Sequence, residues 1–330
     1  MAKNNYQTRG NKWKNGILNI QSSQRFFSLS RFNIFFVLPI IFIVLLHTGC
    51  RSPQTSTPGA TEYTDGLGRK VLIKKDPQRI ISLAPNVTEI LFDLGLGNRI
   101  EGVTTYCDFP EEAKAKTKVG DTLNPSIERI IGLKPDLVII STASQLEKLT
   151  SQLDQLSIPV FVTNPRKVSE AVASIRLLGE VTGTASQANQ LADEMDRRIN
   201  AVETRVKDLP KPRVLYVLQT DPLITAGRQT FINDLIILAG GNSISGDEKA
   251  DYPQFSRETV VARAPEIIIA PSSHGAEFVR EKDLREQFAA TPAIRFDRIV
   301  RVNPDWVDRP GPRIVLGLEQ LAQGLHPEKK

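Results

Sequence analysis

Short apolar runs alternate with amphipathic segments from residue 79 onward. The apolar runs are brief and rich in Ile, Leu and Val, and they cover Arg79–Leu83, Leu137–Ile140, Val160–Val162 and Arg213–Leu218. A helical pattern opens at Pro85 and ends at Gly95. Continuous apolar strands separated by helices are typical of a parallel sheet that helices cover on both faces. The pattern therefore predicts an α/β fold.

One segment has the pattern of a long amphipathic helix. Between Ala185 and Lys207 apolar residues recur at spacings of three and four, which forms a single stripe. The stripe consists of Ala188, Leu191, Ala192, Met195, Ile199, Val202 and Val206. At ~1.5 Å per residue this helix is roughly 35 Å long, about the depth of a small domain. We expect it to join two lobes and to limit their relative motion.

The sequence also contains an internal repeat. Residues 126–140 read SIERIIGLKPDLVII, and residues 256–270 read SRETVVARAPEIIIA. Each copy predicts a helix with a Ser N-cap and an early Glu, then a turn with Pro and an acidic residue, then a buried strand. A looser echo pairs residues 94–98 (LGLGN) with residues 238–242 (LAGGN). Two such units imply two related lobes.

These patterns predict two Rossmann-like lobes, each built on a central, mostly parallel sheet, joined by one long α-helix. We assign residues 70–167 to the first lobe, residues 168–209 to a helical linker and residues 210–330 to the second lobe. Residues 50–69 are rich in Ser, Thr, Pro and Gly, so we expect a flexible tether, with the folded body starting near Val71.

Residues 1–49 have the pattern of a targeting segment. Basic residues and no acidic ones precede Phe32–Leu46, an apolar run of about fifteen residues that is short for a transmembrane helix and typical of a signal sequence. The run leads into His47-Thr48-Gly49-Cys50, which resembles the lipobox of bacterial lipoproteins although His47 replaces an aliphatic residue. That resemblance implies lipidation of Cys50. A plain signal peptide or an uncleaved anchor would export the body equally.

Charge and motif content exclude several function classes. The formal net charge is +5, but six basic residues lie in the leader, which leaves 36 basic groups against 37 acidic ones. A near-neutral body offers no electrostatic footprint for nucleic acid. The sequence contains no P-loop, G-x-S-x-G or G-x-G-x-x-G motif, so we expect no catalytic residues and no enzyme. The three histidines form no cluster with metal-ligand spacing, so we expect no metal site.

Several motifs carry a family resemblance over roughly residues 70–326. They are RIISLAPNVTEILFDLG (79–95), IERIIGLKPDLVI (127–139), AGGN (239–242) and YPQFSRETVVARAPEIII (252–269). With them the chain resembles the helix-linked periplasmic binding proteins of ABC importers for vitamin B12, ferric siderophores and haem. The closing DWVDRPGPRIVLGLEQLAQGLHP (305–327) is most similar to the cobalamin-binding branch.

The resemblance implies a ligand held between the lobes, at the carboxyl ends of the strands. Tyr106, Tyr252, Asp305 and Arg309 match positions that line the pocket of the cobalamin-binding branch. Loop positions add Asn86, Arg228 and Trp306, and aromatic faces with a polar rim suit a large, flat ligand. Thr122, Ser141 and Tyr252 stand where that branch often has tryptophan. The ligand therefore stays open between a corrinoid and a ferric siderophore or haem, for which Arg228, Arg257, Arg309 and Arg313 are candidates.

Glu128 and Glu258 occupy equivalent positions of the repeat. Capping of a helix N-terminus explains an acid there, and the resemblance implies in addition that both glutamates pair with arginines of the two permease subunits. We expect an exported monomer, held by its lipid anchor to the cell membrane on the periplasmic or extracytoplasmic side and serving a permease dimer with its ATPase. Cys107 has three interpretations: an inert, partly buried thiol, a reactive thiol, or an axial ligand to cobalt or iron. The remaining alternatives are a sensor module and an exported α/β enzyme.

Overall fold

The computed structural model describes residues 59–141, 146–272 and 279–328. The leader, Cys50 and the expected tether up to residue 58 lie outside these ranges. Residues 56–330 form one compact unit. In the part of the chain described, none of the helices has both the length and the apolar character needed to cross a membrane.

The first lobe contains a five-stranded parallel sheet in the order β5-β4-β3-β6-β7. Its strands are β3 (Ile80–Ser82), β4 (Ile100–Val103), β5 (Thr117–Lys118), β6 (Leu137–Ser141) and β7 (Val160–Thr163). Its helices are α2 (Pro85–Asp93), η3 (Gly97–Arg99), α3 (Glu111–Lys114), α4 (Ile127–Gly132) and α5 (Leu146–Gln155). Ile80 and Ile139 pack toward α2, whereas Ile81 and Val138 pack toward α4 and α5. Both faces of the sheet are therefore buried, as the apolar runs predicted.

A β-hairpin precedes this sheet, where the sequence predicted a tether. Strand β1 (Ala60–Thr64) pairs antiparallel with β2 (Lys70–Lys74). The folded chain thus begins about ten residues earlier than Val71, and the expected boundary at residue 69 is wrong. Val71 and Ile73 alternate with exposed positions and are buried in the core, which provides the apolar face that holds the hairpin.

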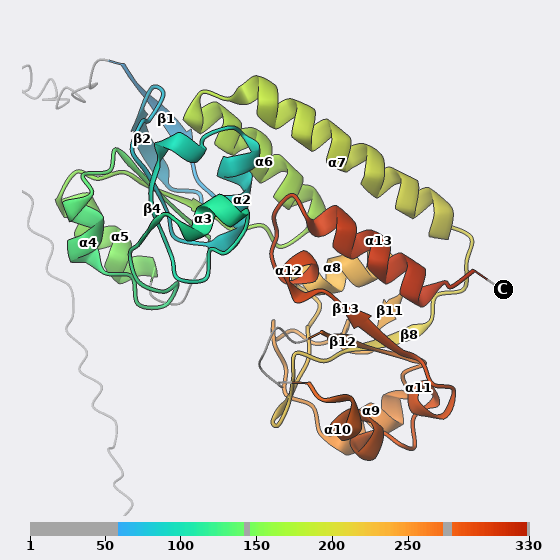
Figure 1. Ribbon diagram of the computed structural model, residues 1–330. Helices are drawn as coiled ribbons and strands as arrows, with labels where there is room; N and C mark the ends of the chain where they lie inside the picture. The colour runs from blue at the N-terminus through green and yellow to red at the C-terminus, as the bar shows by residue number, and fades with distance from the viewer. Residues whose placement is uncertain (1–58, 142–145, 273–278, 329–330) are drawn as a thin grey trace, which may run out of the picture. The chain divides into compact units, whose positions relative to one another are not determined.

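The second lobe repeats the architecture with a four-stranded parallel sheet in the order β11-β8-β12-β13. Its strands are β8 (Arg213–Tyr216), β11 (Asn242–Ser243), β12 (Ile267–Pro271) and β13 (Ile299–Val302), with a small hairpin of β9 (Gln219–Thr220) and β10 (Leu223–Ile224). Its helices are α8 (Phe231–Leu238), α9 (Arg257–Arg263), α10 (Glu281–Gln287), α11 (Pro292–Arg295), α12 (Pro304–Val307) and α13 (Ile314–Leu325). Helices α8 and α13 lie on one face of the sheet and α9, α10 and α11 on the other (Figure 1).

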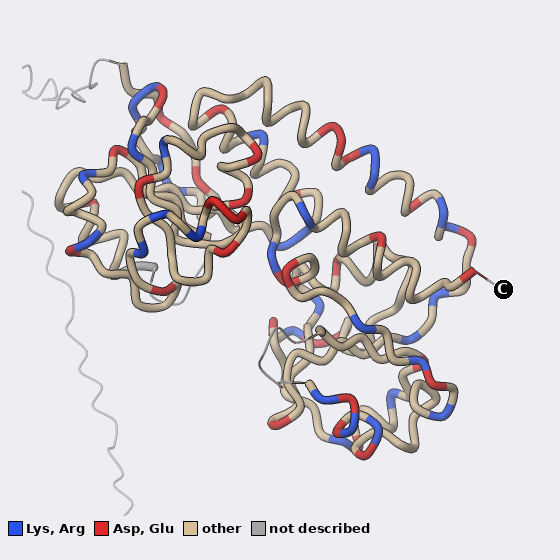
Figure 2. Tube along the Cα trace, viewed as in Figure 1, with Lys and Arg blue, Asp and Glu red and all other residues tan. Residues whose placement is uncertain are grey.

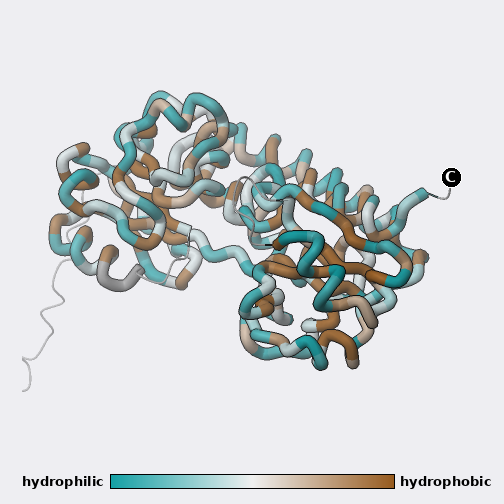
Figure 3. The backbone as a smooth tube through the Cα atoms, turned by 60° about the horizontal axis from the view of Figure 1, so that its bottom comes forward, coloured by the Kyte–Doolittle hydropathy of each residue, from teal (hydrophilic) through white to brown (hydrophobic). Residues whose placement is uncertain are grey.

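Two helices connect the sheets, α6 (Val168–Thr182) and α7 (Ala185–Val206). The predicted long helix is confirmed within one residue of its end, and its stripe is buried at Ala188, Met195 and Val202. Helix α7 packs along α6 and also contacts α13. One continuous apolar cluster includes residues of both sheets and of both connecting helices. Figure 3 shows the hydrophobic colour on strands inside the fold and polar colour on outer surfaces.

The internal repeat extends into the hydrogen bonding. Ser126 and Ser256 cap α4 and α9 by accepting from the backbone N–H three residues later, at 3.3 and 3.1 Å. Asp136 accepts from the backbone N–H of Arg79, and Glu266 accepts from that of Arg213, at 2.9 and 2.8 Å. Each of these arginines leads into the first strand of its sheet. The predicted two-lobed α/β fold is confirmed down to these paired contacts.

Candidate ligand site

The segment from Asn303 to Arg313 carries most of the charged candidates. Asn303 caps α12 by accepting from the backbone N–H of Asp305 at 2.9 Å, and Pro304 occupies the first turn, where a missing N–H costs nothing. One helical turn brings Asp305 beside Arg309, four residues on, at 2.9 Å. The segment therefore presents an acid and a base as a fixed pair.

Glu89 on α2 receives the arginines of this segment. Its side chain is only 2% exposed. Arg313 donates to it from Nε at 2.8 Å and from Nη2 at 2.6 Å, and Arg309 lies 3.5 Å away. The Arg313 guanidinium also stacks on the ring of Phe109 at 4.0 Å, a cation–π contact. Glu89 and Phe109 belong to the first lobe, so the second lobe inserts its arginine between them.

Arg309 stands among three carboxylates. It donates from Nη1 to Asp108 at 2.9 Å, and it pairs with Asp305 and, at longer range, with Glu89. Burial alone would raise the pKa of Asp108, but the hydrogen bond and charge of Arg309 outweigh it and hold that pKa below its ordinary value. At Glu89 the balance is reversed, because burial raises the pKa more than the two arginines lower it. The positive charge of Arg309 is thus balanced by the carboxylates around it.

Tyr252 and Asp308 form a second group close by. Tyr216, which is fully buried on β8, donates its hydroxyl to Asp308 Oδ1 at 2.7 Å. Asp308 as a whole is exposed, but its carboxyl group is shielded from water, and this desolvation raises the pKa of Asp308 to about 6. Although the Tyr252 side chain is largely exposed, partial removal of its hydroxyl from water raises its pKa, and the charges of Asp251 and Asp308 add to the increase. Asp251 in turn pairs with Arg166 at 2.7 Å.

The predicted aromatic residues differ in exposure. Tyr106 is 57% exposed and Tyr252 60% exposed, which is unusual for large aromatic side chains, whereas Trp306 is half-buried. Asn86 is buried at the start of α2, where its Nδ2 lies 3.4 Å from the carbonyl oxygen of Pro310. Tyr106 lies two residues before Asp108. Contacts of α2 and the 106–109 loop with residues 305–313 therefore gather Asn86, Tyr106, Asp305 and Arg309 into one region.

Arg228 lies outside this charge network. It lines two hollows of about 770 and 360 Å³ around the N-terminus of α8, together with Asn233. Among the described residues, none forms a hydrogen bond or an ion pair with the guanidinium of Arg228. Arg257, another arginine proposed for an anionic ligand, is exposed in the first turn of α9. Figure 2 shows positive and negative residues interspersed over both lobes.

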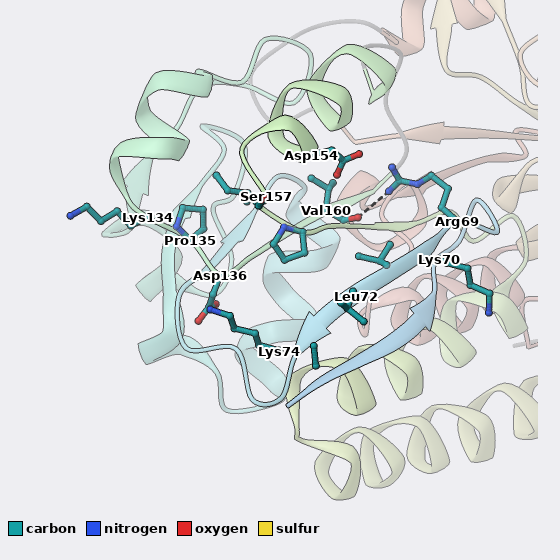
Figure 4. Close-up of a pocket in the computed structure, with 14 residues that line it drawn as sticks. Arg69, Lys70, Leu72, Lys74, Lys134, Pro135, Asp136, Asp154, Ser157 and Val160 are labelled. Carbon is teal, nitrogen blue, oxygen red and sulfur yellow. Dashed lines mark hydrogen bonds between the residues drawn. The ribbon is translucent and has the colours of Figure 1, made fainter. Parts of the chain in front are cut away.

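A further hollow, of about 650 Å³, lies in the first lobe between β2 and the residues that lead into β6 and β7 (Figure 4). Arg69, on its wall, already donates to Asp65 and to the carbonyl oxygen of Val160. In Figure 4 the side chains of Lys70 and Lys134 are directed away from its centre. This hollow is lined by none of the residues expected to bind the ligand.

Glu128 and Glu258 are both exposed in the first turns of α4 and α9, as the repeat predicted. Hydrogen bonds from its own backbone N–H and from the Ser256 hydroxyl lower the pKa of Glu258 below its ordinary value. Cys107 is 1% exposed, and the hydroxyl of Thr88 donates to its sulfur at 3.1 Å. The sulfur is thus enclosed in the first lobe.

Sequence reasoning missed Glu89, Asp108, Phe109 and Asp308. A signal for Glu89 was present, because a charged residue inside the apolar first turns of a helix requires a buried partner. Asp108 and Phe109 carried no such signal, since they lie in a loop whose path depends on the rest of the fold. Their partners are some two hundred residues away in the sequence.

Comparisons with known proteins cover the same region. The profile of a family described as periplasmic binding protein matches residues 80–306. The ABC transporter substrate-binding lipoprotein YvrC of Bacillus subtilis, itself uncharacterised, is 33% identical over 305 residues, covering 88% of this chain and 96% of that protein. The vitamin B12 binding protein BtuF of Vibrio cholerae is 29% identical with a TM-score of 0.69, covering 76% and 97%. The heme-binding protein RhuT of Roseiflexus sp. RS-1, without ligand, is 28% identical with a TM-score of 0.68, covering 75% and 97%.

Proposed function

The chain belongs to the periplasmic binding protein family, and we propose that it captures cobalamin or a related corrinoid and delivers it to the permease of an ABC importer. The proteins of this family bind and hand over substrates rather than convert them. Vitamin B12 binding by BtuF, a relative of similar fold, supports the corrinoid. The match of Tyr106, Tyr252, Asp305 and Arg309 to the pocket positions of that branch supports it from the sequence.

The observation that carries the ligand class is the charge balance of the site. Arg309 and Arg313 are already paired with Glu89, Asp108 and Asp305. An anionic siderophore would have to displace these carboxylates, whereas the amide side chains of a corrinoid donate hydrogen bonds to carboxylates and tyrosine hydroxyls. The exposed rings of Tyr106 and Tyr252 offer apolar faces to a flat macrocycle.

Haem is the second candidate ligand, and one observation favours it. Arg228 has a guanidinium that no described residue pairs, and a propionate is a suitable partner for such a group. The similarity to RhuT, a heme-binding protein, points the same way. In this case Arg228 rather than Arg309 would provide the charge that recognises the ligand.

Calorimetric titration of residues 51–330 with cyanocobalamin tests the ligand. This form retains the whole compact unit of residues 56–330. We expect a one-to-one complex with a dissociation constant below about 1 µM, that is, a binding free energy of about −8 kcal/mol or stronger. Haem would replace the corrinoid as the ligand if the protein failed to bind cyanocobalamin but bound haem tightly, and if Arg228→Ala abolished that haem binding.

Glu128 and Glu258 support a docking role that extends the proposal. They stand at equivalent points of the two lobes, and a pair of equivalent acids matches a permease dimer with two-fold symmetry. Replacing both by Ala should leave the affinity for cyanocobalamin unchanged and abolish uptake by cells that depend on this protein. Glu203→Ala, which removes an exposed acidic side chain on α7, is the control. Normal uptake by the double variant would contradict docking.

Anchoring completes the proposal. A substrate-binding protein must remain near its permease, and lipidation of Cys50 would tether a monomer to the membrane on the outer side, with its permease and ATPase. The lipoprotein YvrC of Bacillus subtilis supports this assignment by its similarity over most of the chain. Metabolic labelling with a fatty-acid analogue should mark the native protein and not the Cys50→Ser variant.

A further inference from the structure

Among the described residues, Glu89 and Arg313 form the most buried of the charged contacts between the two lobes. Its carboxylate is buried on α2 of the first lobe, and both of its oxygens accept from Arg313 of the second lobe. Two further contacts lie nearby: Arg309 of the second lobe donates to Asp108 of the first at 2.9 Å, and Asn86 Nδ2 lies 3.4 Å from the carbonyl oxygen of Pro310. A buried carboxylate with two-point contact to a guanidinium is strong and directional, so this pair fixes the direction from which residues 305–313 approach the first lobe.

Arg309 depends on the same pair. It lies four residues before Arg313 in the sequence, and it reaches Glu89 at 3.5 Å while donating to Asp108 at 2.9 Å. Without Glu89 the buried side of Arg309 would lose a counter-charge, and Arg313 would be left unpaired against Phe109. An unpaired buried charge destabilises its surroundings far more than the loss of an exposed pair does.

We propose that Glu89 is a positioning residue for ligand binding: by holding Arg313 and Arg309 across the lobe boundary, it sets the geometry in which Arg309 and Asp305 meet the ligand. The inference rests on the proposed function for its ligand, because it assigns Arg309 to that site. Its structural part, the attachment of residues 305–313 to α2, is independent of which ligand binds.

Hydrogen exchange of the ligand-free protein tests the structural part. In Glu89→Gln, amides of residues 305–313 should exchange at least about tenfold faster than in the native protein, because the half-buried Arg313 is left without its counter-charge. Glu319→Gln is the matched control. It breaks the two-point pair of Arg198 and Glu319, which joins α7 to α13 at 2.7 and 2.9 Å, and it should leave exchange at 305–313 unchanged. Unchanged exchange in Glu89→Gln would overturn the proposal.

The double variant Glu89→Gln, Arg313→Met separates positioning from a purely structural role. It removes the unpaired charge, so the thermal midpoint should recover, and it remains informative where the single variant does not fold. Cyanocobalamin affinity should stay reduced by about tenfold or more, because residues 305–313 still lack the attachment of Arg313 to Glu89 that places Arg309 and Asp305. If both the thermal midpoint and the cyanocobalamin affinity recovered, Glu89 would have only a structural role and the proposed positioning role would be wrong. If the native protein does not bind cyanocobalamin, the proposed ligand is wrong. If exchange is still accelerated in Glu89→Gln, the attachment of residues 305–313 to α2 through Glu89 stands nevertheless.

Discussion

At the scale of single residues, the exposed tyrosines are the clearest candidates for contact with the ligand. Tyr252→Ala should weaken cyanocobalamin binding by about 1–2 kcal/mol, because an aromatic face contributes stacking as well as buried area. Its side chain is 60% exposed in the free protein, so the thermal midpoint should hardly change. Phe296→Ala is a fitting control, because Phe296 is 74% exposed and precedes β13 at its amino end, away from the carboxyl ends of the strands. Equal affinity losses in both variants would exclude a specific role of Tyr252.

Asp308 makes a prediction about pH. Its pKa rises from the ordinary 3.8 to about 6 on folding, so the folded protein binds this proton more tightly than the unfolded chain does. The stability gained from this proton is complete below the unfolded pKa and is lost as pH rises through about 6. The free energy of urea unfolding, measured from about pH 4 to about pH 8, should fall with rising pH in the native protein. The fall that Asp308 causes should be missing in Asp308→Asn. Identical pH profiles would rule out the coupling.

At the scale of elements, the crossing of α6 and α7 depends on a small residue. A Cβ placed on Gly179 would collide with the Cβ of Ala188, so the two helices pack closely there. Gly179→Ala should destabilise the protein by about 1–3 kcal/mol despite the better helix propensity of Ala. The same substitution at Gly132, near the end of α4, meets open space and should be neutral or stabilising. Urea midpoints of the two variants compare these effects, and equal midpoints would contradict close packing.

The sequence predicted elements well where apolar patterns are long or repeated. The stripe from Ala188 to Val206 identified α7, and the Ser and Glu of the repeat identified the starts of α4 and α9. The β1–β2 hairpin was missed because its strands are short and largely polar outside Val71 and Ile73. A two-stranded hairpin is stabilised by packing on a core rather than by its own sequence.

At the scale of the whole molecule, one apolar cluster joins both sheets through α6, α7 and α13. Two lobes with separate cores would unfold independently, whereas a shared core couples them. We therefore expect a single calorimetric transition for residues 51–330, with equal calorimetric and van't Hoff enthalpies. Two resolved transitions would show that the lobes are energetically separate.

For the ligand site, as for the secondary structure, the sequence predicted features that depend on local residues better than features that depend on distant ones. The family resemblance was confirmed by the profile match over residues 80–306. The positions of Tyr106, Tyr252, Asp305 and Arg309 as ligand contacts remain predictions. The sequence did not indicate that Arg309 and Arg313 would be neutralised by Glu89 and Asp108, because these partners come from the other end of the chain. Charge at such a site depends on the fold rather than on local sequence.

The enclosure of Cys107 has a practical consequence for measuring ligand in real time. Cys107 is the one cysteine within residues 51–330, and it is 1% exposed and accepts a hydrogen bond from Thr88. Maleimide dyes would therefore spare it and react with a single cysteine introduced on the surface. A dye at Phe296, far from the site, would serve as a reference, and a dye next to Tyr252 would report ligand arrival. The native chain is thus already suited to conversion into a reagentless fluorescent sensor.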